Sequence, residues 1–229
     1  MTALANLEQA RYKMIEQQIR PWNVLDSQVL ELLSVVHRED FVPLAQKAMA
    51  FVDMKIPLLA PAEQAISQGH CMLEPKVEAR LLQDLHVGPK DKVLEVGTGS
   101  GYMAALLARR AQRVITLEIE PQLAKTARAN LQRAGVSNVE VREADGAKGL
   151  PSEAPFDVIL LSGSVAEVPH ALLEQLKVGG RLAALVGAEP VMRATFVTRT
   201  GQASFSTAQP WDTVAPRLAG FPEPSRFQF

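Results

Sequence analysis

The sequence predicts an α/β protein with a mainly parallel, twisted sheet flanked by helices and antiparallel strands near the C-terminus. Three observations support this fold class. Short apolar runs rich in β-branched residues alternate with segments of helical periodicity between residues 92 and 186. Glycines 97, 99 and 101 form a turn between the first such strand and its helix. The late apolar segments 192–198 and 203–207 follow each other with no helix between them.

The chain divides by pattern into an N-terminal helical cap, residues 1–86, and a sheet-forming core, residues 87–229, expected to pack as one compact unit. In the cap, Asp26 is expected to be the N-cap of the second helix. Segment 51–67 contains two prolines and few helix signals, so we expect an extended segment across the sheet edge. The helices expected in the cap span residues 4–20, 27–36, 44–50 and 76–85.

In the core, strands and helices alternate, which implies a parallel sheet with right-handed crossovers. The expected strands span residues 93–96, 113–118, 138–141, 156–161 and 181–186, and the expected helices 102–110, 121–134 and 169–176. The tail from residue 210 onward is too rich in proline for a long helix or a central strand. We expect the aromatic side chains Trp211, Phe221, Phe227 and Phe229 to hold this tail on the body.

Composition excludes several classes of protein. The net charge of −1 and pI of about 6.4 argue against a general nucleic-acid or membrane-surface binder. A single cysteine excludes an intrachain disulfide and fits a reducing compartment. The N-terminus lacks a signal-peptide pattern, and no apolar run approaches the roughly 20 residues of a membrane span. We therefore expect a cytoplasmic protein without nucleic-acid or membrane partners; its oligomeric state stays open.

The glycine turn indicates the kind of ligand. Its G-x-G-x-G spacing differs from dinucleotide and triphosphate loops, and no lysine closes it. Glu95, two residues before the first glycine, disfavours phosphate and suits a cation. Glu118 ends the next strand, where an acidic residue suits the hydroxyls of a ribose. S-adenosylmethionine (AdoMet) has a ribose, an ammonium and a sulfonium but no phosphate, so it fits this pattern.

A longer set of motifs resembles a known family. The loop Glu95-Val-Gly-Thr-Gly-Ser-Gly-Tyr102 resembles that of class I AdoMet-dependent methyltransferases, and more narrowly that of protein-L-isoaspartate O-methyltransferases. The resemblance extends from about Arg11 to Arg199 and includes Glu39-Asp-Phe-Val-Pro43 and Gln64-Ala-Ile-Ser-Gln68. It implies a Rossmann-like fold, AdoMet as cofactor, S-adenosylhomocysteine as product, and a protein or peptide with an isoaspartyl or D-aspartyl residue as acceptor.

The resemblance also implies roles for individual residues. Ser67 is the expected catalytic residue, because the matching serine of the family lies near the carboxylate that accepts the methyl group. The acceptor is expected to contact Gln64, Ile66 and His70. The residues expected to bind AdoMet are Glu95, Gly97, Thr98, Gly99, Ser100, Gly101, Glu118, Ile119, Asp145 and Gly146. Four scattered histidines give no metal-binding spacing, so no metal is expected.

The departures from the family pattern fall on the acceptor side, at Glu63, Ala65, Gly69 and the segment 162–164. An added carboxylate near an isoaspartyl carboxylate would repel it. Two alternatives therefore stay open. One is an AdoMet-dependent methyltransferase with a different, small acceptor. The other is a non-catalytic module that binds AdoMet and recognises proteins.

Overall fold

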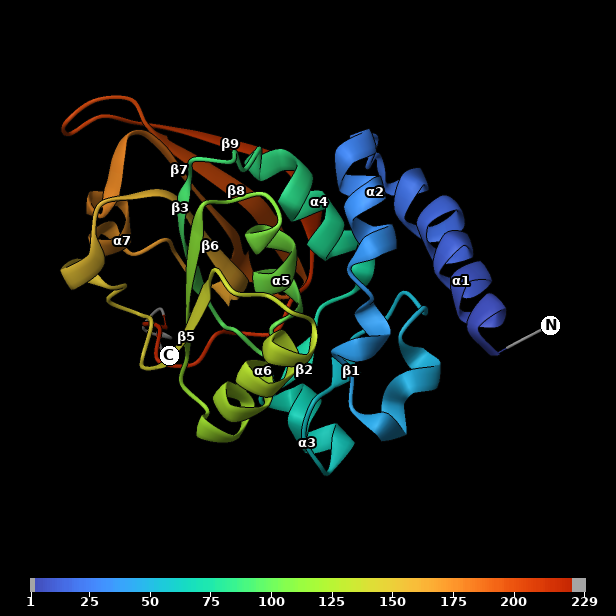
Figure 1. Ribbon diagram of the computed structural model, residues 1–229. Helices are drawn as coiled ribbons and strands as arrows, with labels where there is room; N and C mark the ends of the chain where they lie inside the picture. Colours follow the sequence, from blue (N-terminus) through green and yellow to red (C-terminus); the bar gives the residue numbers. More distant parts are fainter. Residues whose placement is uncertain (1–2, 224–229) are drawn as a thin grey trace.

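The computed structural model describes residues 3–223 and contains a seven-stranded sheet with helices on both faces (Figure 1). The strand order is β5-β4-β3-β6-β7-β8-β9; neighbouring strands are parallel from β5 to β7, and β8 and β9 are antiparallel. This confirms the predicted fold class. The strands are β3 Lys92–Val96, β4 Arg113–Glu118, β5 Val139–Glu143, β6 Phe156–Val165, β7 Leu176–Ala188, β8 Val191–Arg199 and β9 Phe205–Thr213.

The sheet has two buried faces because consecutive strand residues point to opposite sides. Val93 packs in the cluster shared with the cap and α5, whereas the next residue, Leu94, packs in the cluster beneath α7. Their parallel neighbours on β4 and β6 follow the same alternation. The helices are α1 Ala3–Met14, α2 Ser27–Val35, α3 Ala62–Ser67, α4 Pro75–Leu85, α5 Tyr102–Ala108, α6 Pro121–Arg133 and α7 His170–Glu174.

The order of the strands positions the candidate site. From β3 the chain crosses to β4 and β5 on one side and then returns to β6 on the other. In open α/β sheets, ligands bind beside the carboxyl ends of the strands at such a reversal. The glycine turn follows β3 directly and therefore lies at this point.

Helix α4 of the cap packs on α5 and β7 of the core, and α2 packs on α4. The cap also contains a short antiparallel pair of strands, β1 Ile56–Pro57 and β2 Cys71–Met72. Asp26 caps α2 as predicted, since its side chain accepts hydrogen bonds from the backbone N–H groups of Gln28 and Val29. Pro75 begins α4, as expected for a residue without an N–H group. The cap also contains 3-10 turns at Arg20–Trp22, Arg38–Asp40 and Leu44–Met49.

Three expectations need correction. The helix predicted over residues 4–20 is α-helical only to Met14 and continues as a π-helix over Ile15–Ile19. Segment 51–67 is not extended throughout: its last residues form α3, where the helix-forming residues after Pro61 can begin a turn. Finally, the strand expected over residues 203–207 is β9, which spans Phe205–Thr213 and so continues past Pro210. This is possible because β9 is an edge strand, not a central one, and proline needs no ladder donor there.

Two of the four aromatic side chains expected to hold the tail on the body do so. The Trp211 indole N–H donates to Asp84, and Phe221 is buried against the sheet. Phe227 and Phe229 lie outside the described residues. Between residues 3 and 223, the helices are all too short or too polar to cross a membrane.

Candidate functional site

Two adjoining cavities open at the carboxyl ends of β3, β4 and β6. The first, called the cofactor cavity here, has about 570 Å³ of empty space open to solvent. It is lined by Gln68, Gly69, His70, Cys71, Val96, Gly97, Gly99, Leu117, Glu118, Ile119, Leu123, Ala144, Gly146, Ser162, Arg217, Leu218 and Ala219. The second, the inner cavity, has about 320 Å³. It is lined by Cys71, Met72, Leu73, Glu78, Gly97, Thr98, Gly99, Ser100, Tyr102, Met103 and Ser162.

The glycines of the turn have different reasons to be glycine. Gly97 has a φ of 95°, and a Cβ there would lie 2.8 Å from the Leu218 side chain across the cavity. Gly99 has a φ of 53°, and its N–H donates to Glu118 at 2.8 Å. Gly101 does not line the cavities; a Cβ there would press on Leu131 of α6. Only the first two glycines therefore shape the ligand site, and the third allows α5 and α6 to pack.

Glu118 has the geometry expected of a ribose ligand. One carboxylate oxygen accepts from the Gly99 N–H and the other from the Glu120 N–H at 3.0 Å. A carboxylate oxygen has two acceptor sites, so both oxygens retain capacity toward the cofactor cavity that Glu118 lines. Ile119 and Gly146 line the same cavity and supply the flat apolar walls that an adenine needs. Asp145 is exposed, and its side chain caps the turn by accepting from the Ala147 N–H at 2.9 Å.

Glu95 lies beneath the loop and lines neither cavity. Its fully buried carboxyl is hydrogen-bonded to the hydroxyls of Thr116 and Ser162, both at 2.7 Å. Burial raises the pKa of Glu95 to about 8. We expected this residue to touch AdoMet; the structure instead places its bonding partner Ser162 on the cavity wall. Thr98 and Ser100, also expected at the cofactor, line the inner cavity.

The residues expected to contact the acceptor do not line a single cavity. Ser67 is exposed at the end of α3, and its hydroxyl donates to the Gln64 carbonyl oxygen at 2.9 Å. Ser67 and Ile66 line a separate groove, called the outer groove, lined by Lys55, Ile66, Ser67, Ala188, Glu189, Met192, Ala215, Pro216 and Arg217. His70 lines the cofactor cavity, whereas Gln64 is exposed and lines none of these three spaces. Because residues 62–67 are helical, Ser67 lines the outer groove and not the cofactor cavity.

Several lining residues were missed from the sequence. Cys71 lines both cavities, and burial raises the pKa of its thiol to about 11, so the thiol stays protonated. Glu78 lines the inner cavity from α4. Residues 214–221, called the strap, pair in parallel with the carboxyl-terminal part of β6 through a bridge between Arg217 and Ser164. The Leu218 N–H donates to the Ser164 carbonyl oxygen at 2.9 Å, and the Ser164 N–H donates to Pro216 at 2.8 Å. No local sequence signal marked this strand-like pairing.

The residues present fit AdoMet. The two cavities form a bent, continuous space, because Cys71, Gly97, Gly99 and Ser162 line both. Its outer part offers a buried carboxylate and apolar walls for an adenosine. Its inner part offers the carboxylate of Glu78 and hydroxyls for an amino-acid end. The part of the chain that the structure describes contains no group of three or more potential metal ligands.

Comparison with known proteins decides the family. A model of the protein-L-isoaspartate(D-aspartate) O-methyltransferase family matches residues 9–214. The chain belongs to this family. Among its relatives, the protein-L-isoaspartate O-methyltransferase of Koribacter versatilis is 41% identical over 189 residues, covering 82% of this chain and 81% of the relative. That of Methanoculleus marisnigri is 41% identical over 177 residues, covering 77% of each chain.

Solved structures confirm the class I methyltransferase fold. A protein-L-isoaspartate O-methyltransferase structure matches with a TM-score of 0.77 at 24% identity, covering 92% of this chain and 66% of that one. A Plasmodium falciparum protein assigned the same activity, solved in complex with S-adenosyl-L-homocysteine, matches with a TM-score of 0.72 at 17% identity. The match covers 90% of this chain and 96% of the Plasmodium protein.

Proposed function

We propose that this methyltransferase uses AdoMet to methylate the free carboxylate of L-isoaspartyl and D-aspartyl residues in proteins. Membership of the family over residues 9–214 is the observation that carries the proposal. The geometry supports it: a cavity suited to AdoMet meets the outer groove at Arg217, which lines both. A polypeptide acceptor needs such an open groove beside the cofactor. The proposal also includes a cytoplasmic location, because a chain with a single cysteine fits a reducing compartment.

Glu118, Ile119, Gly97 and Gly99 are the residues proposed to hold the adenosine part of AdoMet, and the inner cavity its amino-acid end. Bound AdoMet supplies a methyl group that its sulfonium makes electrophilic. The protein needs no general base, because a carboxylate acceptor is already ionised at neutral pH. Its task is to align donor and acceptor and to exclude water, which alone can remove much of the barrier. Leu218 and the strap contribute to that exclusion by covering the loop.

The departures on the acceptor side have a limited effect in the fold. Glu63 is exposed and lines neither cavity nor the outer groove. Ala65 is buried in α3. Gly69 lines the cofactor cavity with a φ of 79°, a conformation that glycine adopts freely. These positions therefore give little reason to withdraw a carboxylate acceptor.

The proposal is tested with AdoMet that carries a tritiated methyl group. An isoaspartyl peptide should be methylated, and its normal aspartyl twin should not. The product should release its label in mild base, as a methyl ester does. Equal labelling of both peptides, or a base-stable product, would contradict the proposal.

One observation favours a second candidate, a methyltransferase with another acceptor. Ser67, at the outer groove, is placed to meet a polypeptide acceptor, whereas a small acceptor inside the cofactor cavity would meet His70 and Cys71, which line that cavity. Base-stable labelling of a small molecule in a metabolite extract, with no labelling of the isoaspartyl peptide, would favour this candidate. Tight binding of S-adenosylhomocysteine without any methylation would instead favour the non-catalytic binding module.

A further inference from the structure

The side chain best placed beside the reacting centre is Ser162, in the irregular stretch of β6 between Leu160 and Ser164. This inference rests on the proposed function. A ligand with its adenosine in the cofactor cavity and its amino-acid end in the inner cavity must have its middle where the cavities meet. Four residues line both: Cys71, Gly97, Gly99 and Ser162. The sulfonium lies in the middle of AdoMet, and the thiol of Cys71 is only a weak donor. Among the described residues, Ser162 therefore offers the one strong hydrogen-bonding side chain at this junction.

A chain of hydrogen bonds runs from Ser162 into the core. Ser162 Oγ is 2.7 Å from Glu95 Oε1, and Thr116 Oγ1 is 2.7 Å from Glu95 Oε2. Thr116 Oγ1 is in turn 2.6 Å from Thr98 Oγ1. Glu95, Thr98 and Thr116 are all buried. The two ends of the Glu95 carboxyl thus have separate hydroxyl partners, one on β4 and one on β6.

The charges around Glu95 favour its neutral form. Its carboxyl is fully buried, and the acidic groups that act on it are Glu118 from the end of β4 and Glu78 from α4. Both raise its pKa, in addition to the larger effect of burial, whereas the hydroxyls of Ser162 and Thr116 lower it. Glu78 is itself paired with the buried Arg38. The pKa of about 8 leaves Glu95 mostly protonated at neutral pH.

We propose that Ser162 donates the hydrogen bond that orients the acceptor carboxylate, and that protonated Glu95 is the positioning residue that sets the direction of this bond. In this arrangement Thr116 donates to Oε2, and the proton of the neutral acid lies on Oε1 and is donated to Ser162 Oγ, whereas Ser162 donates to Oε1 when Glu95 is ionised. The serine then has its own proton free for the acceptor. A neutral Glu95 also neither repels the incoming carboxylate nor stabilises the positive charge that methyl transfer removes.

The direction of the hydrogen bond between Glu95 and Ser162 depends on pH. When Glu95 loses its proton, Ser162 turns to donate to Oε1 and no longer donates to the acceptor. The kcat/KM for an isoaspartyl peptide, at saturating AdoMet, should therefore fall on the alkaline side of neutral. Glu95→Gln should remove this alkaline limb, because the side-chain amide donates to Ser162 at every pH. One pH unit above the pKa of the wild-type alkaline limb, the kcat/KM of this variant should exceed that of the wild type by about tenfold, since only about a tenth of Glu95 is then protonated in the wild type.

Further variants separate the roles. Ser162→Ala should lose more in kcat/KM for the acceptor, roughly ten- to a hundredfold, than in affinity for S-adenosylhomocysteine. Thr116→Val should move the alkaline limb to higher pH, because ionised Glu95 loses a donor. Ser164→Ala is the matched control: Ser164 is buried on the same strand but donates to Ala215, at 2.9 Å, and the limb should stay in place.

A titration of the ligand-free protein provides a readout without catalysis. In protein labelled with ¹³C at the glutamate carboxyl, the resonance missing from Glu95→Gln should titrate near the pKa of about 8. Ser162→Ala should raise that pKa. Titration of Glu95 in the ordinary carboxyl range, or an alkaline limb that persists in Glu95→Gln, would overturn the proposal. If the wild type methylates no isoaspartyl peptide, the proposed function fails, while the titration still decides the relay.

Discussion

Glu78 is the only acidic side chain among the described residues that line the inner cavity. One of its carboxylate oxygens pairs with the buried Arg38, and burial raises the pKa of Glu78 to about 7. The hydroxyl of Tyr102, which lines the same cavity, has no hydrogen-bond partner within the described chain. An ammonium group entering this cavity would supply the charge and the donors that Glu78 can accept. This is the role that the sequence had assigned to Glu95.

We therefore predict that Glu78→Gln weakens the binding of S-adenosylhomocysteine by roughly tenfold, as for the loss of a charged hydrogen bond. Binding of methylthioadenosine, which lacks the amino-acid end, should be unchanged. Glu118→Ala is the matched control and should weaken both ligands, by roughly 1–3 kcal/mol, because both carry the ribose. Calorimetry measures all four affinities. Equal losses for both ligands in Glu78→Gln would remove the residue from the ammonium site.

At this scale the sequence predicted backbone-dependent features better than side-chain directions. Gly97, Gly99 and Glu118 line the cavity because turn chemistry and strand ends fix them locally. The placement of Ser67 depended on whether residues 62–67 were extended or helical, and a single turn of helix decides it. Cys71 and Glu78 reach the site only through the β1–β2 hairpin and the packing of α4, which no local pattern encodes.

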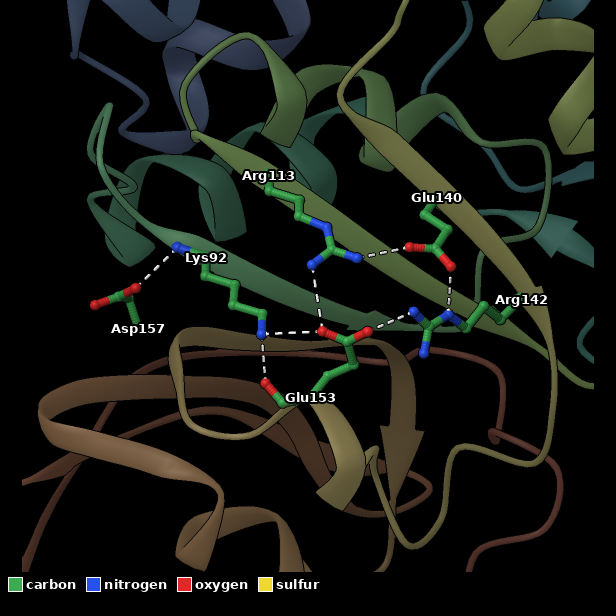
Figure 2. A network of polar contacts seen from close by, with 6 residues as sticks. All are labelled: Lys92, Arg113, Glu140, Arg142, Glu153 and Asp157. Carbon is green, nitrogen blue, oxygen red and sulfur yellow. Dashed lines mark hydrogen bonds and ion pairs between the residues drawn. The ribbon is translucent and has the colours of Figure 1, made fainter.

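Among the elements, strands β3, β4 and β5 and the 3-10 turn Pro151–Glu153 are joined by ion pairs (Figure 2). Glu153 is at the centre: its carboxylate pairs with Lys92 at 3.1 Å, Arg113 at 3.2 Å and Arg142 at 2.6 Å. Glu140 joins the two arginines, at 2.7 and 2.6 Å. The hydrogen bond from Arg142, followed by that from Lys92, lowers the pKa of Glu153 to about 2.

Because the folded-state pKa of Glu153 is depressed, its contribution to stability is present above the unfolded value, about 4.3, and is lost as pH falls toward 2. We predict that Glu153→Gln lowers the melting temperature near neutral pH and that the difference from wild type closes in acid. The difference should also shrink in molar salt, since these charges are exposed to solvent. Glu143→Gln, an exposed acid of β5, is the control and should show no such profile. A pH-independent difference would mean that the ion pairs are not its cause.

The strap is the element that the sequence described least well. A proline-rich tail was expected to lie on the body, but not to pair with β6 and cover the glycine turn. The pairing depends on Ser164, whose N–H, carbonyl and hydroxyl all bond to the strap. Such long-range pairing has no periodic signature, in contrast to β4, whose bounds Arg113–Glu118 were predicted correctly.

Phe221 anchors the end of the strap in the cluster beneath the sheet. We predict that Phe221→Ala loosens the strap, so that S-adenosylhomocysteine dissociates several times faster and stability falls by up to about 3–5 kcal/mol. Stopped-flow displacement measures the dissociation rate, and urea unfolding the stability. Phe205→Ala, at the start of β9 and away from the strap, should lower stability without changing dissociation. An unchanged dissociation rate in Phe221→Ala would show that the strap does not retain the ligand.

At the scale of the whole molecule, we propose that the cap, residues 1–86, and the core, residues 87–229, fold together as one unit. The buried pairs Arg11–Glu39 and Arg38–Glu78 lie where the cap meets the core. Arg38 is fully buried, with its guanidinium also donating to the Leu73 carbonyl at 2.6 Å and lying 5.2 Å from the centre of the Tyr102 ring of α5. The hydrophobic cluster likewise contains residues from both regions. We infer that neither region is independently stable.

Variants of the buried pair Arg38–Glu78 test whether the cap and the core unfold together. Arg38→Met should lower the free energy of unfolding by roughly 3–5 kcal/mol, because it leaves the carboxylate of Glu78 buried without its partner. Adding Glu78→Leu should recover most of the loss, since replacing both members of a buried pair by apolar side chains costs little. Urea unfolding followed by tryptophan fluorescence, from Trp22 in the cap and Trp211 on β9, and by circular dichroism should give one coincident transition in every variant. Separate transitions for the two probes would show that the cap unfolds on its own, and a double variant no more stable than Arg38→Met would show that the arginine acts through its packing instead of its charge.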